Sequence, residues 1–151
     1  MNNYETWYNT LLDISNRSIN TLNNMTLFKG SVVVFDIDDT LIHSNGYCIN
    51  PIIDVFNFVK SIGVIPIIIT NRSGDEKTIE FTKKQLQSSG IFGQKYIYFR
   101  EPSKPNNPFR YKEKARLNIK ERGMTVIMSL GDKLWDIGSC AGVGILIPVY
   151  V

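Results

Sequence analysis

The sequence predicts an α/β fold in which helices cover both faces of a five-stranded parallel sheet. Short apolar runs alternate along the chain with longer segments whose apolar residues recur at helical spacing, as in repeated β-α-β units. The first of these short runs, residues 32–35, ends abruptly in three carboxylates within four positions. Open α/β sheets place their ligands at the carboxyl ends of their strands. We therefore expect an acidic site at that edge of the sheet.

The expected elements follow from apolar periodicity and from residues that start or stop helices. Residues 4–23 carry an apolar stripe at helical spacing and should form an amphipathic helix. Asn50 is expected to cap the next helix, with Pro51 in its first position and Gly63 at its end. The expected strands are 32–36, 64–69, 96–99, 125–130 and 144–147, and the expected helices are 4–23, 51–62, 75–88, 111–122 and a short one near 134–140.

Length and composition indicate one soluble domain. We expect residues 1–151 to form this domain, because a chain of this length can bury roughly 70% of its unfolded surface. The helix inside residues 1–24 is expected to pack on the core. The composition, 43% hydrophobic and 21% charged, is ordinary for a globular protein. No apolar run approaches the ~20 residues that span a bilayer, and the first residues do not resemble a signal peptide. The expectation is a cytoplasmic protein with no membrane partner.

The spacing of the elements leaves no room for a lid domain. Only residues 41–50 separate the first strand from the next helix, and residues 71–110 hold one helix, one strand and a proline-rich loop. We therefore expect an open site, unless an oligomer or a large substrate covers it.

The three carboxylates after the first strand should repel one another unless a cation lies among them. Mg²⁺ is the leading candidate, because it takes oxygen ligands and usually recruits one or two carboxylates. Asp36 and Asp38 lie two positions apart and project to the same side while the backbone stays extended. One can serve as a nucleophile and the other as a proton donor. Asp39 should face the opposite way.

Four segments resemble the motifs of phosphatases of the haloacid dehalogenase (HAD) superfamily. Asp36-Ile37-Asp38-Asp39-Thr40 has the family's DxDxT pattern. Residues 67–72, 111–116 and 131–136 follow in the family's order, as a strand ending in threonine, a lysine near a helix start and a GDxxxD pattern. The residues within these motifs are most similar to those of the acid-phosphatase branch, subfamily IIIB.

This resemblance implies both a fold and a reaction. The fold is a three-layer Rossmannoid with strand order 5-4-1-2-3, here capless and with an extra N-terminal helix. The reaction is Mg²⁺-dependent hydrolysis of a phosphate monoester, in which Asp36 forms an aspartyl-phosphate and Asp38 acts as acid and base. The implied metal ligands are the carboxylates of Asp36 and Asp132 and the main-chain carbonyl of Asp38.

Other residues are expected to bind the phosphate. Thr70 ends an apolar strand at the same edge, where its hydroxyl and the backbone near Asn71 can bind phosphate oxygens. A lysine of the third motif should supply positive charge. Lys112 is preferred to Lys114 because Arg116 follows it four residues later, a spacing found in relatives.

The roles of four further residues stay open. Thr40 is expected to secure the first loop through a side-chain hydrogen bond. Asp136 either binds the metal through water, orients the lysine, or is an ordinary acidic residue at a helix start. Arg72 either reaches the substrate or forms a surface ion pair. His43, the only histidine, is either catalytic or incidental.

The sequence leaves the substrate open. Residues 95–122 are predominantly basic, with aromatic residues between the charges, which fits either a solvated helix face or a nucleic-acid contact. The net charge of +3 does not decide between them. The expected partner is a phosphorylated small molecule, and a nucleic-acid end is the alternative. A catalytically idle binding module on the same fold is a third hypothesis, and the sequence leaves the oligomeric state open.

Overall fold

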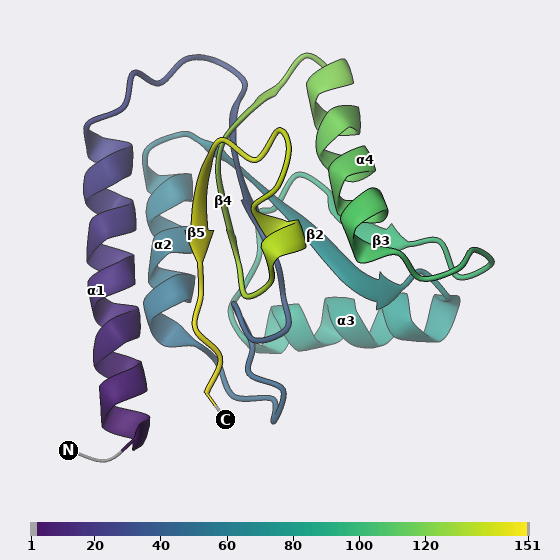
Figure 1. The fold of residues 1–151 in the computed structure, drawn as a ribbon, viewed down its shortest axis with the longest axis horizontal. Coiled ribbons are helices and arrows are strands. Elements are labelled where there is room, and N and C mark those ends of the chain that lie inside the picture. Colours follow the sequence, from purple (N-terminus) through teal and green to yellow (C-terminus); the bar gives the residue numbers. More distant parts are fainter. Residues whose placement is uncertain (1–2, 151) are drawn as a thin grey trace.

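A five-stranded parallel sheet forms the centre of the computed structural model, which describes residues 3–150 (Figure 1). The strands are β1 (Ser31–Phe35), β2 (Ile65–Ser73), β3 (Ile97–Arg100), β4 (Thr125–Gly131) and β5 (Val143–Leu146). Their order across the sheet is β3-β2-β1-β4-β5, and each neighbouring pair is parallel. The expected sheet and its strand order are therefore confirmed.

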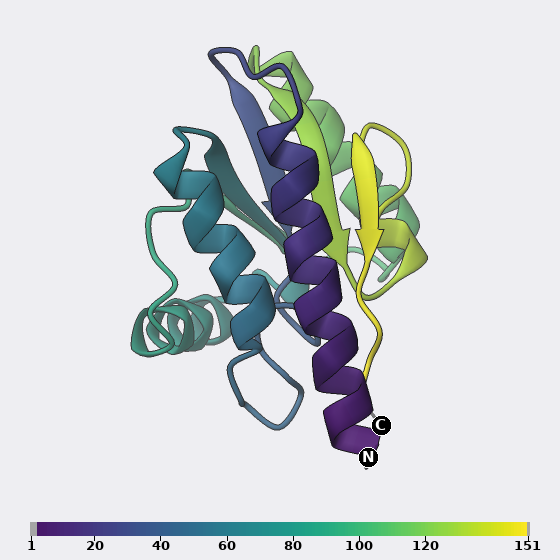
Figure 2. The same cartoon turned by 90° about the vertical axis from the view of Figure 1, so that its left-hand side faces the viewer.

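Helices cover both faces of the sheet and give the molecule three layers. They are α1 (Asn3–Asn23), α2 (Asn50–Ser61), α3 (Glu76–Ser88) and α4 (Pro108–Glu121), with one 3₁₀ turn, η1 (Leu134–Asp136). In β1, Val33 and Phe35 belong to the core shared with α1 and α2, whereas Val32 and Val34 belong to the core shared with α4. Figure 2 shows α1 and α2 side by side on one face, with α4 behind the sheet.

Three of the helices differ in their bounds or length from those predicted in ways that have a clear local description. α4 begins at Pro108 rather than at residue 111, because the Asn107 side chain accepts the Arg110 N–H (3.2 Å) and caps the helix. Asn50 is the first residue of α2 rather than its cap, and Ile49 occupies the cap position without a side-chain hydrogen bond. The helix expected near 134–140 is only the η1 turn.

The two longest connections from strand to helix at the carboxyl edge of the sheet are still short. Residues 36–49 join β1 to α2, and residues 101–107 join β3 to α4. Neither connection contains a helix or a named strand, so within residues 3–150 no inserted domain covers this edge. The fold therefore has the capless form that the sequence indicates.

Helix α1 packs on α2 through one apolar face. Leu11, Ile14 and Leu22 are buried in the core that contains Ile52 and Phe56 of α2. Although α1 is long, none of the helices between residues 3 and 150 combines the length and apolarity needed to cross a membrane.

Both ends of the described chain meet beside the connection that follows β1 (Figure 2). The Trp7 indole donates to the Pro148 carbonyl (2.8 Å), and the ring centroids of Trp7 and Tyr150 are 5.3 Å apart. His43 Nδ1 accepts the Asn45 N–H (3.1 Å), and Nε2 donates to the Tyr150 carbonyl (3.3 Å). We call Trp7, His43 and Tyr150 the terminal cluster. Its contacts give His43 a structural role.

Two neighbouring leucines of α1 test this packing. Leu11 is fully buried, whereas Leu12 is 40% exposed. Leu11→Ala should lower the free energy of unfolding by about 2–5 kcal/mol, because it leaves a cavity between α1 and α2. Leu12→Ala should change it by only about 0.5 kcal/mol. Urea denaturation of both variants measures the difference, and equal losses would contradict the packing described.

Candidate active site

The residues that end the central strands meet at the carboxyl edge of the sheet. Asp36 directly follows β1, and its N–H still donates to the Leu130 carbonyl of β4 (3.0 Å). Asp132 directly follows β4. Thr70 lies inside β2, which is longer than expected and continues to Ser73. Because the strands are parallel, their ends bring these side chains to one edge.

Three buried carboxylates form a cluster at this edge. Oxygen atoms of Asp36, Asp132 and Asp136 lie within 4.8 Å of one another. Their side chains are nearly inaccessible, with exposed fractions of 10%, 5% and 3% respectively. Asp36 and Asp132 were expected together, and the structure adds the carboxylate of Asp136. A set of hard oxygen donors of this kind suits Mg²⁺.

The ammonium group of Lys112 lies inside this cluster. Its Nζ donates to Asp36 Oδ1 (2.9 Å) and to the Ile69 carbonyl (2.6 Å), and it lies 2.8 Å from Asp136 Oδ1. Lys112 is 1% exposed, whereas Lys114 is on the exposed side of α4. Of the two lysines left open by the sequence, Lys112 is the one that contacts the carboxylates.

The electrostatics of the cluster favour an added cation. Burial raises the pKa of Asp36 to about 7 against the lowering effect of Lys112, and burial raises the pKa of Asp136 to about 6. Burial also raises the pKa of Asp132. Burial lowers the pKa of Lys112, but the charges of Asp36 and Asp136 outweigh this effect and raise it above its usual value. One ammonium does not neutralise three carboxylates, so a divalent cation fits this site.

A glycine and a tight turn hold Asp136 in place. The Asp136 Oδ2 accepts the Lys133 N–H (3.1 Å), and the Asp136 N–H donates to the Lys133 carbonyl (2.9 Å). A Cβ atom on Gly131 would overlap the side chain of Asp136. The glycine before Asp132 is therefore required for the close approach of Asp136 to the strand end.

Arg116 fastens the η1 turn to α4. It is 1% exposed and donates to the carbonyls of Ser139 (2.7 Å) and Trp135 (2.9 Å). Sequence reasoning used Arg116 only to choose between two lysines and missed this role. Its position four residues after Lys112 could have indicated this role, because residues four apart lie on the same face of a helix.

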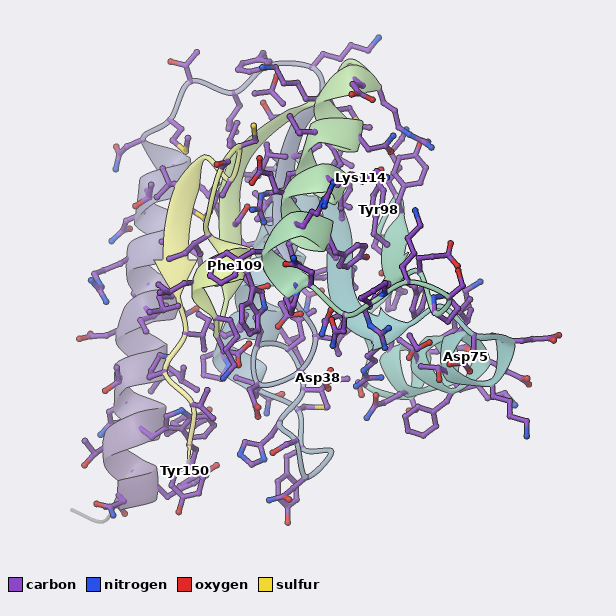
Figure 3. The ribbon with its side chains drawn as sticks, turned by 45° about the vertical axis from the view of Figure 1, so that its right-hand side comes forward. Asp38, Asp75, Tyr98, Phe109, Lys114 and Tyr150 are labelled. Atoms are coloured by element: carbon purple, nitrogen blue, oxygen red, sulfur yellow. The ribbon has the colours of Figure 1, made fainter. Side chains whose placement is uncertain are left out.

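Arg72 holds Asp38 with a two-pronged ion pair. Its Nε donates to Asp38 Oδ2 (3.1 Å) and its Nη2 to Asp38 Oδ1 (2.8 Å). Its Nη1 also donates to Thr82 Oγ1 (3.1 Å) and Gln85 Oε1 (2.8 Å) of α3. Arg72 is therefore a largely buried partner of Asp38, whose own side chain is 51% exposed. Figure 3 shows Asp38 beyond the ends of the central strands.

The expected phosphate-binding residues lie beside this pair. Thr70 is fully buried, and its hydroxyl accepts the Arg72 N–H (3.1 Å). The Asn71 carbonyl accepts a hydrogen bond from Arg100 Nε (3.2 Å). The Asn71 Oδ1 is buried and has no hydrogen-bond partner among residues 3–150.

The loop after Asp36 is closed by its backbone rather than by the Thr40 side chain. The N–H groups of Thr40, Leu41 and Ile42 all donate to the Ile37 carbonyl (3.2, 2.9 and 3.0 Å). The buried Thr40 hydroxyl has no partner in the described part of the chain, so the side-chain hydrogen bond expected for it was wrong. Asp39 adopts a left-handed conformation (φ 57°) and lies outside the carboxylate cluster.

Comparisons with known proteins identify a family and a shared fold. Residues 48–144 match the family described as HAD superfamily, subfamily IIIB (Acid phosphatase), a range that begins after the first motif. A comparison with curated proteins gave no match.

Two solved structures of the class C acid phosphatase from Bacillus anthracis share the fold. One has a TM-score of 0.64 at 18% identity and aligns with 87% of this chain and 67% of its own. The other, with tungstate bound, has a TM-score of 0.61 at 16% identity, with 87% and 63% aligned. The chain thus spans about two thirds of the length of these proteins. Since the sequence match covers more than half of the chain, the chain belongs to subfamily IIIB of the HAD superfamily, the acid phosphatases.

Proposed function

We propose that this chain is a Mg²⁺-dependent phosphomonoesterase that hydrolyses its substrate through an aspartyl-phosphate on Asp36. The observation that carries the proposal is the 2.9 Å contact between Lys112 and Asp36 within the carboxylate cluster. Phosphoryl transfer to a carboxylate needs a nucleophile, cations for the phosphate charge and a nearby acid. Residues suited to each role lie at the same edge, which argues against a catalytically idle module.

The first step moves the phosphoryl group to the enzyme. One oxygen of the Asp36 carboxylate attacks the phosphorus atom, and the bond from phosphorus to the ester oxygen breaks. A protonated Asp38 gives its proton to that oxygen, so the alcohol leaves in neutral form. Lys112 offsets negative charge on the phosphoryl oxygens, and we assign Thr70 and Asn71 to binding those oxygens.

The second step regenerates the enzyme. The carboxylate of Asp38 takes a proton from water, whose oxygen attacks the phosphorus atom. The bond between phosphorus and Asp36 breaks, and inorganic phosphate leaves. Arg72 supports both steps by fixing the orientation of the Asp38 carboxylate, while the exposed half of Asp38 is open to water.

The metal would be held by the carboxylates of Asp36 and Asp132 and by the main-chain carbonyl of Asp38. When bound, Mg²⁺ neutralises phosphate charge and lowers the barrier to attack by an anionic nucleophile. Asp136 supports the site by holding Lys112 at 2.8 Å. Thr40 also has a supporting role, because its N–H donates to the Ile37 carbonyl and helps to close the loop after Asp36.

We further propose that the substrate is a phosphorylated small molecule, which the match to the acid phosphatase family favours. Cytoplasmic location stays a prediction from the sequence, which leaves the oligomeric state open.

The nucleophile is tested by Asp36→Asn with Asp39→Asn as its matched control. An amide cannot form the aspartyl-phosphate, so hydrolysis of p-nitrophenyl phosphate should fall by about a thousandfold or more. Asp39→Asn should keep nearly full activity, because asparagine tolerates the left-handed conformation and can still accept the Ser44 N–H. Steady-state rates with Mg²⁺ and circular dichroism spectra compare the two. More than about a tenth of the normal rate in Asp36→Asn would rule out this nucleophile.

The metal is tested by chelation. EDTA should abolish hydrolysis and Mg²⁺ should restore it, whereas Ca²⁺ should support it poorly because it prefers more ligands at longer distances. Asp132→Asn should need a higher Mg²⁺ concentration for half-maximal rate, because one charged ligand is lost. An enzyme fully active in metal-free buffer would refute the site.

The Arg72 contact is tested by the dependence of the rate on the leaving group. Arg72→Gln should lower kcat/KM for an alkyl phosphate by about 10²-fold, because a poor leaving group depends on a well-placed acid. The loss should be smaller for p-nitrophenyl phosphate, whose phenolate leaves without full protonation. Lys84→Gln, which breaks an exposed pair with Glu80, is the control and should change neither value. If Arg72→Gln lowers kcat/KM by the same factor for both esters, Arg72 does not act through Asp38.

A further inference from the structure

A hollow lies beside the candidate active site, between β3, the connection 101–107 and α4. Its volume is about 640 Å³. We call it the β3–α4 groove, and its lining includes Tyr98, Arg100, Lys104, Arg110, Tyr111 and Lys114. Figure 3 shows Tyr98 and Lys114 next to each other where α4 passes β3.

The groove has a strong excess of positive charge. Arg100, Lys104, Arg110 and Lys114 line it, and no ion pair in residues 3–150 engages any of them. The acidic residue in its lining, Glu101, accepts a hydrogen bond from Ser103 Oγ (2.9 Å). Four like charges around one hollow repel one another, and a bound anion would relieve that repulsion.

The groove also has a direct structural link to the candidate active site. Arg100 donates to the carbonyl of Asn71, the residue that follows Thr70. Tyr111 immediately precedes Lys112, and its hydroxyl is buried without a partner among the described residues. Burial raises the pKa of Tyr111, and smaller contributions come from the charges of Tyr98 and Asp36. A buried hydroxyl without a partner is a natural contact for a polar ligand group.

We propose that the β3–α4 groove binds a second phosphate group of the substrate, remote from the phosphate that is cleaved. The inference rests on the proposed function and narrows its substrate class to esters with at least two phosphates. Lysine and arginine side chains bind phosphate through charge-assisted hydrogen bonds. Tyr111 lines the groove and directly precedes Lys112, which contacts Asp36, so the proposed ligand would extend from Asp36 along this segment to the groove.

Direct binding tests the groove without requiring turnover. Adenosine 3′,5′-bisphosphate and adenosine 5′-monophosphate are titrated calorimetrically into the full chain with EDTA present. The bisphosphate should bind about tenfold more tightly, which is the effect of one charge-assisted contact. The double variant Arg110→Gln/Lys114→Gln should lose this preference. The matched control Lys77→Gln/Lys83→Gln removes two exposed charges of α3 and should keep it.

A 5′-phosphorylated oligonucleotide distinguishes the two sources of a second phosphate. If the groove takes a single phosphate of a small molecule, the oligonucleotide should bind no more tightly than the bisphosphate. If it follows a nucleic-acid backbone, the oligonucleotide should bind more tightly, and its affinity should fall steeply with salt. Either result supports a phosphate-binding groove, provided that the double variant abolishes the gain.

Equal affinities for the bisphosphate and the monophosphate would overturn the proposal, as would a preference that survives Arg110→Gln/Lys114→Gln. The basic side chains would then be a solvated helix face. This failure is separate from failure of the proposed function, which hydrolysis of p-nitrophenyl phosphate with Mg²⁺ tests independently.

Discussion

The ammonium group of Lys112 contacts Asp36 after β1, the Ile69 carbonyl of β2 and Asp136 of η1, and the rest of the candidate site is arranged around these contacts. Burying a charged group costs several kcal/mol unless its partners surround it. The carboxylates around Lys112 would in turn repel one another without it. Ammonium and carboxylates therefore hold one another in place, and loss of either leaves an uncompensated charge in the interior.

Helix α4 divides its cations between two faces. Lys112 and Arg116 lie one turn apart and are both buried. Lys112 contacts the carboxylates, and Arg116 donates to the carbonyls of Trp135 and Ser139. Arg110 and Lys114 are exposed and line the β3–α4 groove. A single helix thus fixes the geometry of the acidic cluster and forms one wall of the hollow beside it.

The sequence predicted most of the fold and two of the three carboxylates of the acidic cluster, Asp36 and Asp132, because both predictions depend on local patterns. Apolar runs followed by carboxylates locate strand ends, and parallel strands bring their ends to one edge. The contact between Arg72 and Asp38 could not be read in this way, since it spans 34 residues and depends on how α3 approaches β2. Arg116 donates to main-chain carbonyls in and after the η1 turn, a short segment without helical or strand periodicity. No sequence pattern could therefore predict these hydrogen bonds. The side-chain hydrogen bond expected for Thr40 is not formed among the described residues, and backbone hydrogen bonds to the Ile37 carbonyl close the loop in its place.

The terminal cluster joins three segments that lie far apart in the sequence. The bond from Trp7 to Pro148 spans 141 residues, and His43 ties the same corner to the connection that carries Asp38. Segments linked in this way are expected to open as one cooperative unit, with amide protons that exchange with a shared free energy of opening. We therefore expect fraying at either end of the described chain to reach the loop that holds the proposed acid, so that the order of this loop depends on residues remote from the chemistry.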